Sequence, residues 1–166
     1  ILTPQGWLKD GSVLISDGKI LEVTNSDLAV IGAKVVDAKG MYIVPGFVAM
    51  NVHGGGGHDF KECTEEAFHS AIAAHMKHGA TTLFPTLSSS PKELICKAVS
   101  ICEKLMAEKD GPVLGLHVEG PYLNTKMAGN LYDVKDPDEE EYRSILESTN
   151  CIKRWDASPE LPGAHD

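Results

Sequence analysis

The sequence predicts an α/β protein in which a segment of short strands precedes a region of alternating strands and helices. Two observations support this fold class. An Asp17-Gly18 pair separates two short apolar runs, and no helical periodicity appears before residue 60. From residue 43, apolar β-rich stretches and amphipathic stretches follow in a βαβαβ order. Because parallel neighbours need a crossover helix, this order indicates a parallel sheet or barrel.

The N-terminal segment is predicted to contain short strands joined by turns. Asp17 and Gly18 both tolerate positive φ, so the pair indicates a tight hairpin. The expected strands span residues 12–15, 19–23, 34–36 and 41–44. The texture of the sequence changes near Gly40 to Ile43. We therefore predict two domains, over residues 1–42 and 43–166.

Three stretches of the second domain are predicted to be helical. The first spans residues 64–78 and has Gly79 in place as its C′ residue. The second opens with Ser90-Pro91-Lys92-Glu93, a capping box with proline at N1. The residues from Asp136 to Glu139 repeat that arrangement, and we interpret the acidic run from Asp136 to Glu141 as a solvated helix start.

Four apolar stretches of the second domain are predicted to be its strands. They span residues 43–52, 80–85, 113–118 and 151–155. A complete eight-stranded barrel takes roughly 250 residues, so residues 43–166 supply about half of one.

The composition restricts the partners of the chain. The formal net charge of −9 argues against a nucleic-acid surface, which needs clustered Lys and Arg. No apolar run reaches the length of about 18 residues that a membrane span requires. The 4 cysteines are scattered without a C-x-x-C pair, so we predict reduced thiols in a cytoplasmic protein.

The candidate functional residues lie at the ends of two predicted strands. Parallel sheets carry their reactive groups at the C-terminal ends of strands, where the loops converge. His53 precedes four glycines, and Glu119 precedes Gly120-Pro121. Strand alternation places His117 and Glu119 on one face, so Glu119 is a candidate ligand for Zn²⁺.

Structural roles are the alternatives for these residues. Glu119 could cap a neighbouring backbone, and a lone His53 could be a structural histidine. His75 and His78 fall near the end of a predicted helix, where the helix dipole favours a cationic ring, so we interpret them as structural. His58 and His165 are left unassigned.

Four motifs along the chain are distinctive when taken together. They are Ile43-Val-Pro-Gly-Phe47, Asn51-Val-His53-Gly-Gly-Gly-Gly57, Gly115-Leu-His-Val-Glu-Gly-Pro-Tyr-Leu-Asn124 and Trp155-Asp-Ala-Ser-Pro-Glu-Leu-Pro-Gly163. In this order they resemble the N-acetylglucosamine-6-phosphate deacetylases of the amidohydrolase superfamily, and the glycine-rich turn and the His-x-Glu-Gly-Pro strand end are specific to this branch.

The resemblance implies a partial (β/α)8 TIM-type barrel, its first half, preceded by a small β-sandwich segment. It implies removal of the acetyl group from N-acetylglucosamine 6-phosphate, giving glucosamine 6-phosphate and acetate. Glu119 and His53 would hold a divalent metal, expected to be zinc, and the loop at Gly129 and Asn130 would contact the sugar. The catalytic Asp base and two further His ligands are expected beyond residue 166, so the fragment alone is expected to be inactive.

Two positions depart from the pattern of the resembled family. Asn51 stands where many superfamily members have the first His of a His-x-His pair, and Leu131 replaces a polar residue of the sugar loop. Two alternatives therefore stay open. One is another amidohydrolase acting on a cyclic amide or ureide, and the other is a non-catalytic half-barrel. Exposed strand edges of a half-barrel would favour a homo-oligomer.

Overall fold

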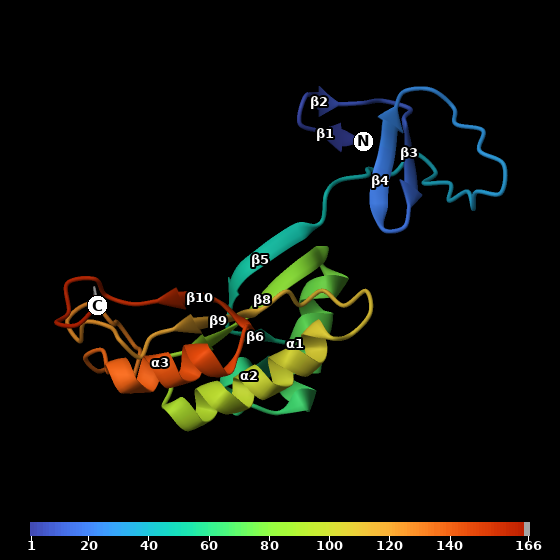
Figure 1. The fold of residues 1–166 in the computed structure, drawn as a ribbon. Helices are drawn as coiled ribbons and strands as arrows, with labels where there is room; N and C mark the ends of the chain where they lie inside the picture. The colour runs from blue at the N-terminus through green and yellow to red at the C-terminus, as the bar shows by residue number, and fades with distance from the viewer. Residues whose placement is uncertain (165–166) are drawn as a thin grey trace. The chain divides into compact units, whose positions relative to one another are not determined.

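The computed structural model describes residues 1–164 and divides into two units, Ile1–Pro45 and Gly46–Asp166 (Figure 1). His165 lies outside the described residues. No helix in the described part of the chain combines the length and the apolar character needed to cross a bilayer.

The N-terminal unit contains two antiparallel strand pairs. Strand β1 (Leu2–Thr3) pairs with β2 (Gly6–Trp7), and β3 (Ser12–Ser16) pairs with β4 (Lys19–Thr24). At the turn between β3 and β4, Asp17 has φ 51° and Gly18 has φ 71°. Both central residues of the turn are therefore left-handed, as a tight hairpin requires, and the predicted hairpin is confirmed.

The prediction of two further strands in this unit is wrong. Residues 34–36 and 41–44 form no strand. Val35 and Val36 are 83% and 80% exposed, and Met41 and Tyr42 are 70% and 81% exposed. Residues 34–36 have no partner strand, and residues 41–44 share with β1 one backbone hydrogen bond, from the Leu2 N–H to the Ile43 carbonyl over 2.9 Å. Their β-propensity is not realised because one such bond makes no ladder and neither segment has a buried face, and strand preference largely reflects such packing.

The second unit contains a four-stranded sheet in which every neighbouring pair is parallel. The strand order is β10-β9-β8-β5. The strands are β5 (Phe47–Val52), β8 (Ala80–Ser88), β9 (Leu116–Glu119) and β10 (Ile152–Asp156). The predicted α/β class with a parallel sheet is therefore confirmed. A short antiparallel pair, β6 (Gly54–Gly55) and β7 (His58–Asp59), follows β5.

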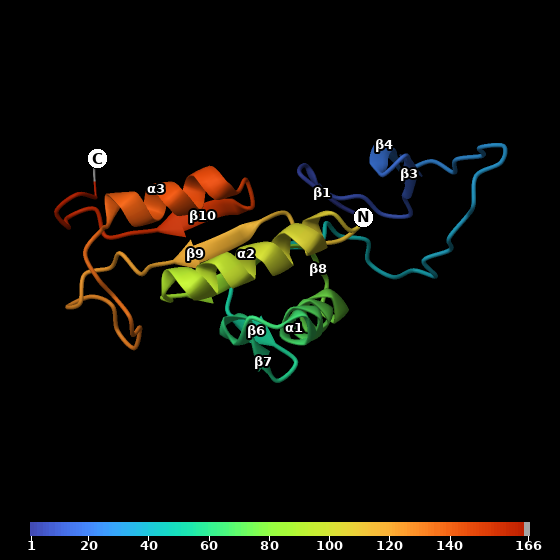
Figure 2. The same ribbon diagram turned by 60° about the horizontal axis from the view of Figure 1, so that its bottom comes forward.

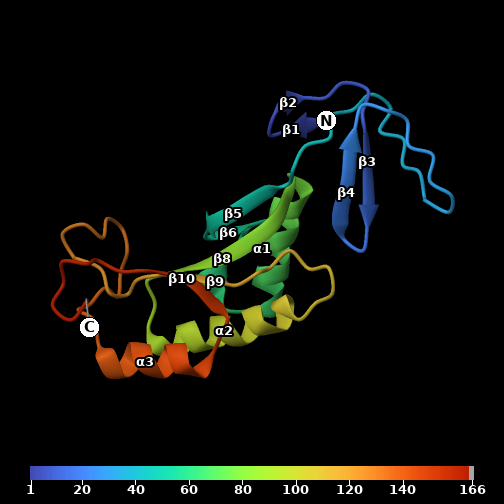
Figure 3. The same cartoon turned by 45° about the horizontal axis from the view of Figure 1, so that its top comes forward.

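Three α-helices lie on the same side of this sheet, as Figures 2 and 3 show. They are α1 (Glu65–Lys77), α2 (Lys92–Met106) and α3 (Glu139–Ser148), and a 3-10 turn, η1 (Phe60–Glu62), precedes them. The start of α1 is as predicted, because Thr64 accepts a hydrogen bond from the Ala67 N–H. Gly79 has φ 93° at its end, as a C′ residue should.

The predicted caps of α2 and α3 are wrong. Ser90 Oγ donates to the Ser88 carbonyl over 2.7 Å, so it does not cap the helix, and Pro91 is the N-cap residue instead. In α3 the cap is Asp138, which accepts from the Glu141 N–H, and not Asp136. The acidic run does open a solvated helix start, as predicted, with Glu139 to Glu141 in its first turn.

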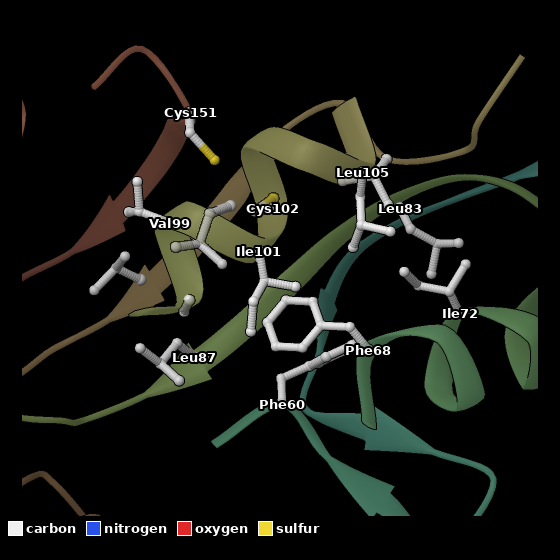
Figure 4. Packing of buried hydrophobic residues seen from close by; sticks show 14 of the residues in the cluster. Phe60, Phe68, Ile72, Leu83, Leu87, Val99, Ile101, Cys102, Leu105 and Cys151 are labelled. Atoms are coloured by element: carbon white, nitrogen blue, oxygen red, sulfur yellow. The ribbon is translucent and has the colours of Figure 1, made fainter. Parts of the chain in front are cut away.

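The core lies between the helices and the sheet (Figure 4). Phe60 and Phe68 meet edge to face with ring centroids 4.8 Å apart, and both are fully buried. Leu83 and Leu87 of β8 and Leu105 of α2 belong to the same cluster. This packing fixes β8 and β9 from the helical side, and it thereby sets the strand ends that carry the candidate site.

Candidate functional site

The structure brings the two predicted metal ligands together. His53 follows β5 and Glu119 ends β9, and β8 lies between these strands in the sheet. His53 Nε2 is 3.3 Å from Glu119 Oε2. Their side chains are 44% and 24% exposed, so the pair is open to a ligand from solvent. This convergence at one edge of a parallel sheet is where the fold class places chemistry.

A glycine-rich turn holds the backbone after His53. The His53 carbonyl accepts a hydrogen bond from the Phe60 N–H over 2.9 Å, and His75 Nε2 donates to the Gly54 carbonyl over 2.9 Å. A Cβ at Gly54 would lie 2.1 Å from the His58 carbonyl oxygen, so the β6–β7 pair requires glycine there. His75 is structural, as predicted, although its role is a backbone contact.

Glu119 ends a strand that is held on both sides. It is in register with Ser88 of β8 and with Asp156 of β10. The next residue, Gly120, donates its N–H to the Asp156 carbonyl over 3.0 Å and accepts from Trp155 Nε1 over 2.8 Å. Gly120 has φ 83°, a left-handed conformation that favours glycine.

A buried histidine that sequence reasoning did not single out lies two residues before Glu119. His117 is fully buried, with Nδ1 3.1 Å from Thr86 Oγ1 and Nε2 3.1 Å from Asp156 Oδ2. Arg154 donates from Nε and Nη2 to the two Asp156 oxygens, over 2.9 and 3.0 Å. In the sequence, the alternation of β9 places His117 and Glu119 on one face and so points to His117. The polar neighbours of His117 come from two other strands, and the alternation does not indicate them.

The electrostatics of this group follow from burial and from its partners. Burial lowers the pKa of His117, and the nearby Asp156 carboxylate offsets part of that effect. Burial by itself raises the pKa of Asp156, but Arg154 and His117 together bring that pKa below its ordinary value. Asp156 is therefore ionised at neutral pH and is neutralised by Arg154.

The side chains at the sheet edge supply some of the ligands that a divalent cation needs. An imidazole nitrogen and a carboxylate oxygen are both ligands that Zn²⁺ accepts, and structural or catalytic zinc takes about four. Within residues 1–164, no group of three or more His, Cys, Asp and Glu side chains is placed to hold a metal ion. His53 and Glu119 therefore fit as two ligands of a site that needs others.

The predicted sugar-contacting residues lie elsewhere on the chain. Gly129 and Asn130 are exposed in the loop between β9 and α3, and Gly129 has φ 60°. No hydrogen bond or ion pair between described residues joins them to His53 or Glu119. This loop is tied down nearby, where Ser89 Oγ donates to the Asp133 carbonyl over 3.2 Å. His58, left unassigned from sequence, lies 3.1 Å from Glu62 Oε2.

Comparisons with known proteins identify what the chain is similar to. A protein of Haemophilus influenzae is 33% identical over 132 residues, which are 78% of this chain and 34% of that protein. A protein of Lysinibacillus sphaericus is 28% identical over 95% of this chain and 39% of its own length. Both relatives are N-acetylglucosamine-6-phosphate deacetylases. The human deacetylase is 31% identical over 130 residues. No family model matches the chain.

Solved deacetylase structures share the fold. The Pasteurella multocida deacetylase superposes with a TM-score of 0.85 at 23% identity, which bears on the fold alone. The Mycobacterium smegmatis deacetylase superposes with a TM-score of 0.79 at 30% identity, over 93% of this chain and 40% of that one. The resemblance predicted from sequence is confirmed. The chain spans 30% to 42% of the length of these deacetylases.

Proposed function

We propose that this chain is part of a metal-dependent hydrolase that removes the acetyl group from N-acetylglucosamine 6-phosphate, giving glucosamine 6-phosphate and acetate. The observation that carries the proposal is the convergence of His53 Nε2 and Glu119 Oε2, 3.3 Å apart, at the C-terminal edge of the sheet. The names of the relatives support the substrate, and one Mycobacterium smegmatis deacetylase variant was solved in complex with that sugar phosphate.

The two ligands have distinct roles in this proposal. Glu119 supplies negative charge that attracts a cation, and His53 supplies a neutral donor through Nε2. A zinc ion held by these residues would lower the pKa of a water ligand and polarise the acetamide carbonyl. The general base and the other metal ligands belong to later strands, and the chain alone is inactive in this proposal.

The remaining parts of the proposal concern the whole protein. In it, the parallel sheet is the first half of a (β/α)8 barrel, residues 1–42 belong to a small β-sandwich, and Gly129 and Asn130 contact the sugar. We also propose a cytoplasmic homo-oligomer. Strand β5 is an edge of the sheet in this chain, and its Phe47 and Val48 are 67% and 60% exposed. In the closed barrel of this proposal, that edge would pair with the last barrel strand.

The experiment that tests the function is a chimaera. The 132 matched residues of the Haemophilus influenzae deacetylase are replaced by the corresponding residues of this chain, and glucosamine 6-phosphate release is measured. We expect turnover, and we expect Glu119→Gln to reduce kcat/KM by at least about 100-fold, because even outer-shell partners of metal ligands cost 10–100-fold. Glu66→Gln, at an exposed position of α1, is the matched control.

Two results would contradict the proposal. Equal turnover by the parent chimaera and its Glu119→Gln variant would remove Glu119 from the site. Hydrolysis of a cyclic amide or ureide, with no release of acetate from the sugar phosphate, would favour the other amidohydrolase branch.

A further inference from the structure

His117 contacts the strands on both sides of β9, close to the candidate site. It belongs to β9 and is fully buried, yet its two ring nitrogens face polar atoms of different strands. Nδ1 lies 3.1 Å from Thr86 Oγ1 of β8, and Nε2 lies 3.1 Å from Asp156 Oδ2 of β10. The Nε2 contact is within ion-pair distance without hydrogen-bond alignment, and this nitrogen has no other partner among the described residues.

The neighbours of the ring assign its protons. A lone pair on Nε2 facing the Asp156 carboxylate would be repelled and left without a partner, so the proton lies on Nε2. Nδ1 then accepts the hydroxyl proton of Thr86. The alternative acceptor for that proton is the Phe84 carbonyl, at 3.2 Å, which the hydroxyl uses if Nδ1 is protonated.

Thr86 connects this ring to the residue before His53. Thr86 Oγ1 accepts a hydrogen bond from the Val52 N–H over 2.9 Å. The β5–β8 ladder is irregular between Ala49 and Val52, so a side chain supplies the contact at the point where β5 ends. The path therefore runs from Asp156 through His117 and Thr86 to the backbone that carries His53.

We propose that His117 is a positioning residue for the His53–Glu119 pair. By joining β9 to Thr86 and Asp156, the ring prevents β9 from sliding against its neighbours, and Thr86 places Val52 and hence His53 opposite Glu119. The inference rests on the proposed function only in that the pair binds a metal. His117 itself is not a ligand, because its ring is buried between strands.

Zinc affinity of the chimaera, which supplies the remaining ligands, and backbone exchange of this chain test the assignment. Zinc binding to the chimaera is measured by titration calorimetry, and amide exchange of Val52 and His53 in this chain is measured by NMR without metal. Thr86→Val is nearly isosteric and removes only the bridging oxygen. We expect about a 10- to 100-fold weaker zinc affinity, the range for outer-shell partners, and faster exchange at Val52. Thr82→Val, the same change on the same strand, should match the parent chain.

A second pair of variants separates positioning from packing. In His117→Asn the side-chain carbonyl keeps an acceptor near the Nδ1 position, whereas His117→Leu preserves more volume but offers no acceptor. Positioning predicts that the Asn variant retains the higher zinc affinity and the slower Val52 exchange. If Leu equals or exceeds Asn, or if Thr86→Val behaves like the parent, the inference is overturned. Should the parent chimaera bind no zinc, the proposed metal site fails, while Val52 exchange still decides the positioning role.

Discussion

His53 and Glu119 meet at one point, but the strands that carry them are opposite in character. β9 lies between two neighbours in the sheet, and Leu116 and Val118 are 0% and 1% exposed. β5 is an edge strand, and its Phe47 is 67% exposed. Glu119 is therefore placed by close packing of the core, whereas His53 is placed by a few specific polar contacts. Substitutions that displace Glu119 and substitutions that displace His53 should therefore act through different contacts.

The largest expected loss of stability comes from truncating a buried side chain of β9, the strand that carries Glu119. Leu116→Ala removes a fully buried side chain from β9, so we expect a loss of about 3 kcal/mol in the free energy of unfolding, measured by urea titration. Val48→Ala, on edge strand β5 at 60% exposure, is the control and should cost about 0.5 kcal/mol. Equal losses for the two variants would break the contrast between the strands.

A substitution in the glycine turn after His53 should also cost stability, although it removes no buried apolar side chain. Gly54→Ala places a Cβ 2.1 Å from the His58 carbonyl oxygen, and the rigid backbone there cannot yield cheaply. We expect a loss of about 2 kcal/mol, within the range for overpacking, on thermal or urea unfolding. Gly57→Ala meets no atom within 4 Å and carries only the strain of φ 88°, about 1 kcal/mol. A reversed order would contradict the role of the β6–β7 contact.

The smallest expected effect concerns the hydrogen bond from His75 of α1 to the glycine turn. His75→Ala removes the Nε2 hydrogen bond to the Gly54 carbonyl, and we expect a loss of about 1 kcal/mol together with faster amide exchange in residues 54–59. His69→Ala, an exposed position on the same helix, controls for the loss of an imidazole. If both variants exchange alike in the turn, His75 does not hold it.

Local signals in the sequence were enough to predict the features that local chemistry determines. The Asp17-Gly18 turn forms because both residues adopt left-handed φ without help from the rest of the chain. The alternation that places His117 and Glu119 on one face of β9 depends only on strand period. His53 and Glu119 were both found at strand ends, since parallel strands end at a common edge.

Features that depend on partners distant in sequence could not be predicted. Val35 and Val36 have strand-forming side chains but no neighbouring strand, and they remain exposed. Ser90 has the residue type of a cap, yet its hydroxyl bonds to the Ser88 carbonyl. The environment of His117 required the register of β8 and β10 against β9, which no spacing within one strand reveals.

Zinc stoichiometry of the chimaera tests the central claim most directly, because the Haemophilus influenzae part supplies the ligands that the proposal assigns to later strands. Metal content is measured by inductively coupled plasma mass spectrometry on the parent chimaera, Glu119→Gln and Glu66→Gln after equilibration with zinc and removal of the excess. We predict zinc bound to the parent chimaera and to Glu66→Gln, and lost from Glu119→Gln. Zinc retained by Glu119→Gln, or no zinc on the parent chimaera, would contradict a metal site built on His53 and Glu119.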